Sequence, residues 1–373
     1  MNFNKLFVVF ALFAAVFNSS IKAGAAEETP KQGEEKKGFN ATKVIFGHIA
    51  DSHEWHLFEL NGAPIAFPLP VIAYSPTKGL QMFSAAHFEE WHESADGKAE
   101  ISNSYNGLHL ERAMKEKLVT DDGSTVYDIS ITKNVLSMLI GIALLLWITT
   151  SAAKRYKSAG TMAAPKGMQN GLEAIIIFIR DEVARPNLGN KANKYLPLIL
   201  TIFFFIWINN LLGLLPGGAN FTGNIAITSC LALVSFIVMM ASSNKHFWSH
   251  LLNPPNVPFL VKILLVIIEF LSLLIKPVAL MIRLFANMLA GHIVILSVIC
   301  MIFIFGALSK VAGIGFAPFS IAFSIFMFML ELLVAAIQAF IFANLTAVFI
   351  GQAVEEGHGH EHDHHTSENE IIA

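Results

Sequence analysis

Long runs of apolar residues are the feature that most limits how this chain can fold. From Val135 onward the sequence holds several stretches long enough to cross a bilayer, which takes roughly 20 apolar residues in a helix. The chain is 54% hydrophobic and 14% charged, whereas soluble domains carry roughly 25% charged residues. We therefore expect an all-α polytopic membrane protein with about five spanning helices, at residues 135–150, 195–215, 224–241, about 260–305 and about 318–352.

The last two apolar runs are unusually long, and we expect a glycine-containing loop with Lys310 to join them. At 1.5 Å per residue, a helix of roughly forty residues measures about 60 Å, whereas the hydrocarbon core of a bilayer is about 30 Å thick. Both helices must therefore tilt strongly or bend.

Basic residues predict which end of the first span faces the cytoplasm. Lys154, Arg155 and Lys157 follow this span directly, and the positive-inside rule places such a flank in the cytoplasm. The stretch at 171–186 (GLEAIIIFIRDEVARP) is short for a span and charged at its end, so we expect an interfacial helix on the cytoplasmic face. The remaining spans then alternate in direction, and the C-terminus lies in the cytoplasm.

Three segments are expected before the membrane domain. Residues 1–26 are typical of a signal peptide, because a short apolar stretch follows a lysine and precedes small residues; an uncleaved anchor is the alternative. Residues 27–40 are charged and poor in apolar residues, which predicts a disordered linker. Residues 41–130 alternate short apolar runs with turn signals at 61–62 (NG) and 121–123 (DDG), which predicts a small, exported and partly β region.

Charged side chains stand inside one of the long apolar runs. Each costs at least roughly 2.5–3.5 kcal/mol at bilayer depth, so each needs a reason to be there. Glu269, Lys276 and Arg283 follow one another at seven-residue intervals, nearly two helical turns, so the three share one helix face, and Asn287 lies near it. Such a polar stripe is expected to face protein or a water path.

Arg283 is the hardest of these charges to explain. Snorkelling to the cytoplasmic surface can account for Lys262 and Lys276, but arginine stays charged in essentially any protein environment. No acidic residue lies within one helical turn of Arg283. We therefore expect its partner to come from another chain; the alternative is that the charges pair with one another and only hold the helices together.

The last apolar run carries Glu331 and Gln338, again seven residues apart and on one face. A glutamic acid in apolar surroundings can hold a proton near neutral pH and pass it on; alternatively, hydrogen bonds within the bundle satisfy it. Together with His292 on the preceding helix, these side chains predict a proton route between two antiparallel helices.

Four motifs resemble subunit a of F-type ATP synthases. Residues 283–292 (RLFANMLAGH) and 338–342 (QAFIF) are similar to the signatures of its last two helices, and residues 276–278 (KPV) and 207–216 (WINNLLGLLP) add to the match. The similarity covers roughly residues 130–352, and combines motifs, their order and the number of spans.

This resemblance implies a proton-translocating stator subunit of the FO sector, which is not an enzyme and has no cofactor, in the cell inner membrane. The expected partners are a ring of c subunits, b-type peripheral stalk subunits and the lipid bilayer. The resemblance implies that Arg283 faces the ring carboxylates and that Glu269 lines the cytoplasmic half-channel. It assigns Asn287, His292, Glu331 and Gln338 to the other half-channel. Some members carry an acidic residue where this chain has Gly213, so proton entry through that earlier span is expected to rely on Asn210 or on water.

Two rival functions are open at this point. An ion-coupled secondary transporter would also carry intramembrane charges, but transporters usually show internal repeats, and the Arg283 segment is not repeated. A membrane scaffold would use its polar residues only to hold helices together.

Histidines gather in three places, at residues 48–56, at residues 87–92 and in the tail at 353–373. In the first two places the spacing matches no specific zinc pattern, so packing or surface positions are expected rather than a metal site. The tail is expected to be disordered in the cytoplasm, following the membrane domain at 131–352.

Overall fold

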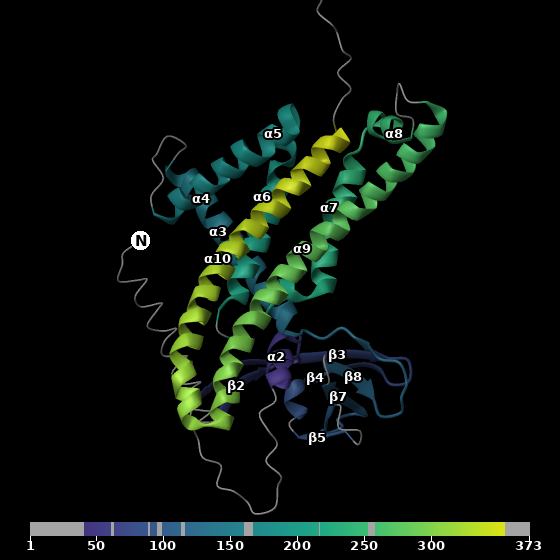
Figure 1. Cartoon of the computed structure of the whole chain (residues 1–373). Coiled ribbons are helices and arrows are strands. Elements are labelled where there is room, and N and C mark those ends of the chain that lie inside the picture. Colours follow the sequence, from purple (N-terminus) through teal and green to yellow (C-terminus); the bar gives the residue numbers. More distant parts are fainter. Residues whose placement is uncertain are drawn as a thin grey trace, which may run out of the picture.

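A strand-rich N-terminal part lies at one end of a bundle of long helices in the computed structural model (Figure 1). The structure describes residues 41–354 except 61–62, 89, 95–98, 113–115, 160–166, 216 and 253–257. The expected signal peptide (1–26), the linker (27–40) and all but two residues of the tail (353–373) lie outside the described residues.

The polytopic all-α architecture is confirmed. Within the described part of the chain, five helical segments are long and apolar enough to cross a membrane. Their principal helices are α3 (Lys133–Ala159), α6 (Ala192–Gly213), α7 (Ile225–Ser242), α9 (Phe259–Leu308) and α10 (Lys310–Val354). They run in alternating directions, because each begins at the end of the bundle where the previous one stops (Figure 1).

Short helices lie at the end of the bundle away from the strands (Figure 1). The stretch expected to be interfacial, residues 171–186, lies in α4 (Met168–Phe178), the π-helical turn η2 (Ile179–Ala184) and the start of α5 (Arg185–Leu188). The turn η3 (Gly189–Lys191) then leads into α6. The position of residues 171–186 at a membrane surface stays a prediction. The helix α8 (Lys245–Leu252), between α7 and α9, was not expected from the sequence.

The prediction of a glycine-containing loop between the last two helices was wrong. Only Ser309 separates α9 from α10, and the glycines of the expected loop lie inside the two helices, Gly306 in α9 and Gly313 and Gly315 in α10. Glycine permits this tight hairpin, since a Cβ atom on Gly313 would stand 2.7 Å from the Cα of Gly306. With 50 and 45 residues, the two helices measure about 75 and about 68 Å, and both run obliquely through the bundle (Figure 1).

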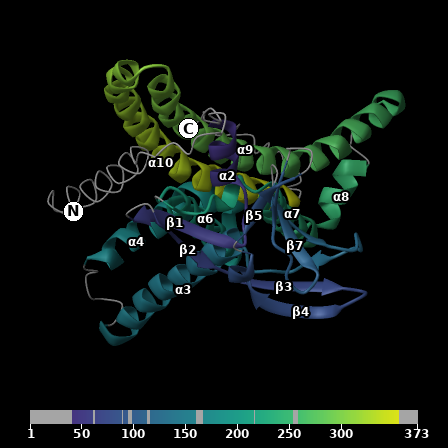
Figure 2. The ribbon, with the colours of Figure 1, turned by 90° about the horizontal axis from the view of Figure 1, so that it is seen from below.

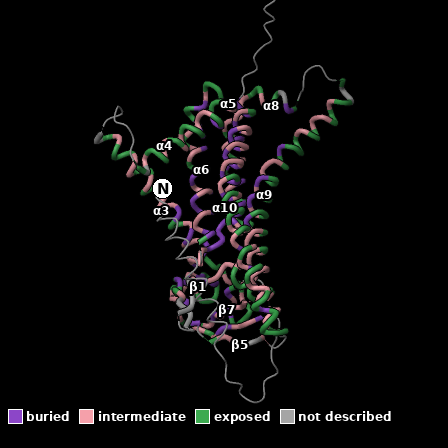
Figure 3. Tube along the Cα trace, turned by 60° about the vertical axis from the view of Figure 1, so that its left-hand side comes forward, coloured by how far each residue is buried: buried purple, intermediate pink, exposed green. Residues whose placement is uncertain are grey.

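The core of the bundle lies between α6 and α10 (Figure 3). Three alanines at four-residue intervals, Ala339, Ala343 and Ala347, are fully buried on α10. Small residues allow two membrane helices to approach closely, and the resulting van der Waals contacts stabilise their association. Such contacts matter in a bilayer because the hydrophobic effect contributes little to helix association there. The large apolar side chains of α6, such as Ile199 and Ile206, fill the facing side.

The N-terminal part contains α2 (Ala41–Ile49) and three antiparallel sheets, which confirms the expected β content. The hairpin pairs β1 (Glu54–Leu60) with β2 (Ala63–Pro68), Leu60 opposite Ala63. The other sheets follow the orders β4-β3-β9 and β5-β6-β7-β8. Their strands are β3 (Pro70–Ser75), β4 (Gly79–Ser84), β5 (Trp91–Glu93), β6 (Glu100–Ser102), β7 (Leu108–Arg112), β8 (Glu116–Thr120) and β9 (Tyr127–Asp128), with the turn η1 (Ala85–His87) after β4.

The turn expected at residues 121–123 exists, with Gly123 at a φ of 70°, but it does not close a hairpin. The next strand, β9, leaves β8 and pairs with β3 instead. A core of Val71, Phe88, Leu108 and Leu110 lies between the sheets. Viewed from below, the strands stand beside the α9–α10 turn and leave it uncovered, while α2 packs against α9 (Figure 2).

Candidate functional site

Arg283 lies at the middle of α9, as the 25th of its 50 residues. Its side chain is exposed, while the neighbouring Leu284 and Met288 are 1% exposed and hold this part of α9 against the bundle. Within the described residues, Arg283 forms neither a hydrogen bond nor an ion pair. The chain therefore presents an uncompensated positive charge on its outer surface, about 36 Å from either end of the helix.

Exposed apolar side chains surround this charge. On the half of α9 before Arg283, Ile275, Val278 and Ile282 are each about half exposed. Exposing such an apolar face to water is unfavourable, so lipid or an apolar helix of another protein is expected to cover it. The surface around Arg283 is therefore suited to contact with a second membrane protein.

Glu269 is half-buried and lies 14 residues before Arg283, about 21 Å toward the first end of α9. Between them, Lys276 donates a hydrogen bond from Nζ to Oε1 of Gln352 at 2.7 Å and interacts electrostatically with Glu269. Lys276 thus ties α9 to the end of α10, while Glu269 is left beside an already partnered cation.

His292 and Glu331 meet across the last two helices. Nδ1 of His292 lies 2.5 Å from Oε1 of Glu331, and Nε2 lies 3.3 Å from the carbonyl oxygen of Gly213. Because that carbonyl can only accept, Nε2 carries a hydrogen, and a second proton can reside on either Nδ1 or Oε1. Gly291 makes room for this contact, since a Cβ atom there would stand 2.7 Å from Oε1 of Glu331.

Asn210 connects α6 to the same part of α10. It is fully buried, donates from Nδ2 to the carbonyl of Ala335 at 3.3 Å and accepts from the hydroxyl of Thr222 at 2.8 Å. Ala335 lies between Glu331 and Gln338 along α10, and both of these side chains are buried. We call the four residues Asn210, His292, Glu331 and Gln338 the polar seam.

Thr222 is a member of this arrangement that sequence reasoning missed. It lies in the turn η4 (Phe221–Gly223), in a loop of ordinary polar and small residues with no distinguishing pattern. Only the packing of η4 against α6 and α9 brings its hydroxyl to Asn210.

The sequence-predicted residues fall into two groups on opposite sides of α9. Nine residues separate Arg283 from His292, which is about 13 Å along the helix and half a turn around it. Asn287 is exposed on the side of Arg283 rather than in the polar seam. The arrangement can hold and exchange a proton inside the bundle, at His292 and Glu331, and attract an anion on its outer surface, at Arg283.

The first histidine group of the N-terminal part has a different environment. His53 is 2% exposed and lies between two carboxylates, with Nδ1 2.8 Å from Oε1 of Glu116 and Nε2 3.0 Å from Oδ2 of Asp128. Burial lowers the pKa of His53, but the hydrogen bonds to Asp128 and Glu116 outweigh it and raise the pKa to about 9. Among the described residues, no group of three His, Cys, Asp or Glu side chains is arranged to hold a metal ion.

Two family models match the chain. The model described as ATP synthase A chain matches residues 135–351, which contain all the membrane helices except the first two residues of α3 and the last three of α10. A second model, described as a domain of unknown function, matches residues 44–136, which contain the strands and most of α2.

Several curated proteins are similar to this chain over most of its length. The ATP synthase subunit a of Chlorobium phaeobacteroides is 44% identical over 305 residues, covering 78% of this chain and 86% of the relative. The ATP synthase subunit a 2 of Prosthecochloris aestuarii is 40% identical over 298 residues, covering 78% and 90%. The ATP synthase subunit a of Chloroherpeton thalassium is 43% identical over 249 residues, covering 64% and 72%.

Proposed function

Since the chain belongs to the ATP synthase A chain family, we propose that it is the stator subunit that carries protons to and from the rotor of an ATP synthase. It is a multi-pass membrane protein whose part in the complex is transport rather than catalysis. In this role it exchanges protons with carboxyl groups on a neighbouring ring of c subunits, and the ring turns as they are loaded and unloaded.

The exposed, unpaired Arg283 is the observation that carries this proposal. A carboxyl group on a rotor is stable in lipid only when protonated, because an ionised carboxylate is costly at that depth. Beside Arg283 the ionised form is stabilised instead: two unit charges 4 Å apart attract by about 4 kcal/mol at an effective dielectric constant of 20. A passing carboxyl group therefore gives up its proton at Arg283 and cannot carry it directly across.

The two polar groups on either side of Arg283 supply separate routes. Toward one end of α9, Glu269 receives protons that leave the ring. Toward the other, the polar seam delivers protons, with His292 and Glu331 as the pair that exchanges them. Along α9, His292 lies about 13 Å from Arg283 and Glu269 lies about 21 Å from it in the opposite direction. This separation keeps the two routes apart, so a proton passes from one to the other only while bound to a carboxyl group of the rotor.

The basic residues at the end of α3 indicate how the chain is oriented in the membrane. Lys154, Arg155 and Lys157 lie at the end of α3 remote from the strands, and basic flanks favour the cytoplasm. The N-terminal part is then on the exported side, with the polar seam nearer to it and Glu269 nearer to the cytoplasm. The peripheral stalk is expected to hold the chain still against the turning ring.

A single substitution tests the proposed function. The Arg283→Ala variant is purified as the whole ATP synthase, reconstituted in liposomes and supplied with ADP, phosphate and an imposed proton gradient. We expect proton-driven ATP synthesis to be lost, while subunit composition on a native gel is unchanged. The matched control is Lys310→Ala, which removes an exposed charge at the α9–α10 turn and should synthesise ATP normally. Normal synthesis by Arg283→Ala would refute the proposal.

A further inference from the structure

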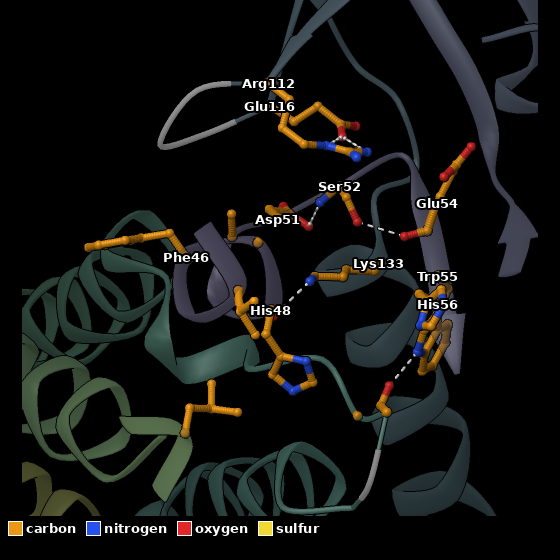
Figure 4. Close-up of a pocket in the computed structure, with 16 residues that line it drawn as sticks. Phe46, His48, Asp51, Ser52, Glu54, Trp55, His56, Arg112, Glu116 and Lys133 are labelled. Atoms are coloured by element: carbon orange, nitrogen blue, oxygen red, sulfur yellow. Dashed lines mark hydrogen bonds and ion pairs between the residues drawn. The ribbon is translucent and has the colours of Figure 1, made fainter. Parts of the chain in front are cut away.

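A cavity of about 340 Å³ lies between the N-terminal part and the membrane helices (Figure 4). Its walls come from five regions of the chain: α2 through the start of β1, the facing ends of β7 and β8, the first residue of α3, the loop at Gly217 and Gly218, and Leu296 on α9. The function proposed above uses none of these residues. At about 30 Å³ per molecule in the liquid, the cavity has room for several waters.

One wall of the cavity is rich in ionisable side chains. They come from α2, the segment that joins it to β1, β1 itself, the β7–β8 pair and the first residue of α3, and they are His48, Asp51, Glu54, His56, Arg112, Glu116 and Lys133. Glu116 is already paired, since it accepts from Arg112 at 2.7 Å and holds His53. Polar walls of this kind keep water in a cavity, whereas apolar cavities stay dry.

Hydrogen bonds hold the N-terminal part to the membrane helices around the cavity. The indole of Trp55 donates to the carbonyl of Gly217 at 2.6 Å, and Nζ of Lys133 donates to the carbonyl of His48 at 3.1 Å. Asp51 accepts from the backbone of Asn134 at the start of α3. The cavity is therefore a fixed part of the fold, and it lies at an interface that orients α2.

The cavity lies next to the polar seam. Leu296 in its wall is four residues after His292 on α9, which is one helical turn or about 6 Å away on nearly the same side. Gly217 and Gly218 shortly follow Gly213, whose carbonyl accepts from His292. On the cavity side, the side chain of His48 is accessible, but the surrounding protein lowers its pKa to about 4, first by burial and then through the nearby charges of Lys133, His292 and His56. The ring is therefore neutral near pH 7.

We propose that this cavity is an outer antechamber that collects protons on the exported side, and that His48 passes them to His292 and Glu331. The inference rests on the proposed function, because it extends the route that delivers protons to the rotor. The neutral imidazole of His48 accepts a proton at one ring nitrogen and releases one from the other, which leaves it neutral as the opposite tautomer. A turn of the ring restores the first tautomer before the next proton. In Figure 4 this ring points away from Asp51 and Arg112, toward the membrane helices.

Blocking the cavity tests the antechamber. In a chain with both native cysteines replaced, Leu296→Cys is treated in the whole complex with a negatively charged methanethiosulfonate reagent that cannot cross the membrane. Passive proton flow is measured in liposomes whose exported face is outward, before and after labelling. The matched control is Leu80→Cys on β4, at a side chain that is 63% exposed and outside the cavity. We expect labelling to stop most of the flow at position 296 and to leave it unchanged at position 80. Complete labelling of Leu296→Cys with undiminished flow would overturn the antechamber.

Chemical rescue tests the role of His48. The His48→Ala variant should lose most of its passive proton flow and regain it when imidazole is added on the exported side, because imidazole can enter the space left behind. A residue needed only for packing would not respond to imidazole. Unreduced flow in His48→Ala, or reduced flow that imidazole does not restore, would remove His48 from the route.

Failure of the inference is distinguishable from failure of the proposed function. If Arg283→Ala abolishes ATP synthesis while the cavity variants have no effect, protons reach His292 by another path and only the antechamber is wrong. If Arg283→Ala synthesises ATP normally, the proposed function itself is wrong.

Discussion

Raising the pH from 6 to 9 should weaken the N-terminal part of the protein, because His53 is held in its charged form by two carboxylates. The ring is buried, and each of its nitrogens lies within 3.0 Å of a carboxylate oxygen, from Glu116 on β8 and Asp128 on β9. The backbone N–H of His53 also donates to Glu116 at 2.8 Å. This one side chain thereby joins two of the three sheets to the segment that precedes β1.

The size and direction of the effect follow from linkage. The pKa of His53 is raised from 6.5 to about 9, so its contribution to the free energy of unfolding is fully present below pH 6.5 and disappears as the pH rises through 9. Each pKa unit corresponds to about 1.4 kcal/mol, which gives a loss of about 3 kcal/mol between pH 6 and pH 9. Burial raises the pKa values of Asp128 and Glu116, but their bonds to His53 and other donors outweigh burial and lower them. Their contribution is therefore lost at acidic pH instead.

Pulse proteolysis in a urea series measures this change in the purified complex, because a protease cuts the N-terminal part only where it is unfolded. The urea midpoint should fall steadily from pH 6 to pH 9 in the native chain. The His53→Gln variant should start lower and change little over this range. The matched control His109→Gln removes an imidazole bound to Asp121 at the surface but leaves His53 in place, so it should keep the native slope. A native midpoint that is the same at pH 6 and pH 9 would refute the reasoning.

Three further predictions concern the proton routes. Glu331→Gln should slow passive proton flow, because the pair with His292 can no longer exchange a proton; unaltered flow across a pH series would argue against its role. Gly291→Ala should displace the side chain of Glu331 and weaken its hydrogen bond to His292. Because a charged hydrogen bond is worth about 1.5 kcal/mol or more, the passive proton flow should slow about tenfold. Gly306→Ala on the same helix has open space for its methyl group and serves as the control; equal rates in the two variants would count against the contact. Glu269→Gln should slow proton release on the cytoplasmic side, and a normal rate of ATP synthesis in that variant would exclude Glu269 from the route.

The sequence predicted the features that depend on one helix at a time. The length of the apolar runs determined the spans, and an interval of four residues, about one helical turn, placed Arg283 and Asn287 near one face, where both are exposed. Seven-residue spacing also placed Glu331 and Gln338 together, and both are buried. Such periodicity is a local property of the helix, so the sequence contains it.

Features that depend on contacts between segments could not be predicted in the same way. The position of His292, half a turn from Arg283, matters only once α6 and α10 cover that side of α9. The turn predicted at 121–123 exists, but the strand after it, β9, pairs with β3 rather than with β8, and the turn residues do not encode that choice of partner. The glycines of α10 were misread as a loop because close approach of two helices also requires residues without a Cβ atom.

The central claim is that Arg283 faces a carboxyl group on the rotor, and cysteine cross-linking tests it most directly. Ala290 is exposed and seven residues from Arg283, so it shares the outer face of α9, whereas Leu284 is 1% exposed and faces the bundle. In the whole complex, Ala290→Cys or Leu284→Cys is combined with a cysteine beside the membrane-buried carboxyl group of the ring subunit, and mild oxidant is added. We expect a disulfide between the two subunits with Ala290→Cys and none with Leu284→Cys. A cross-link from Leu284→Cys alone, or none from Ala290→Cys in an intact complex, would contradict the central claim.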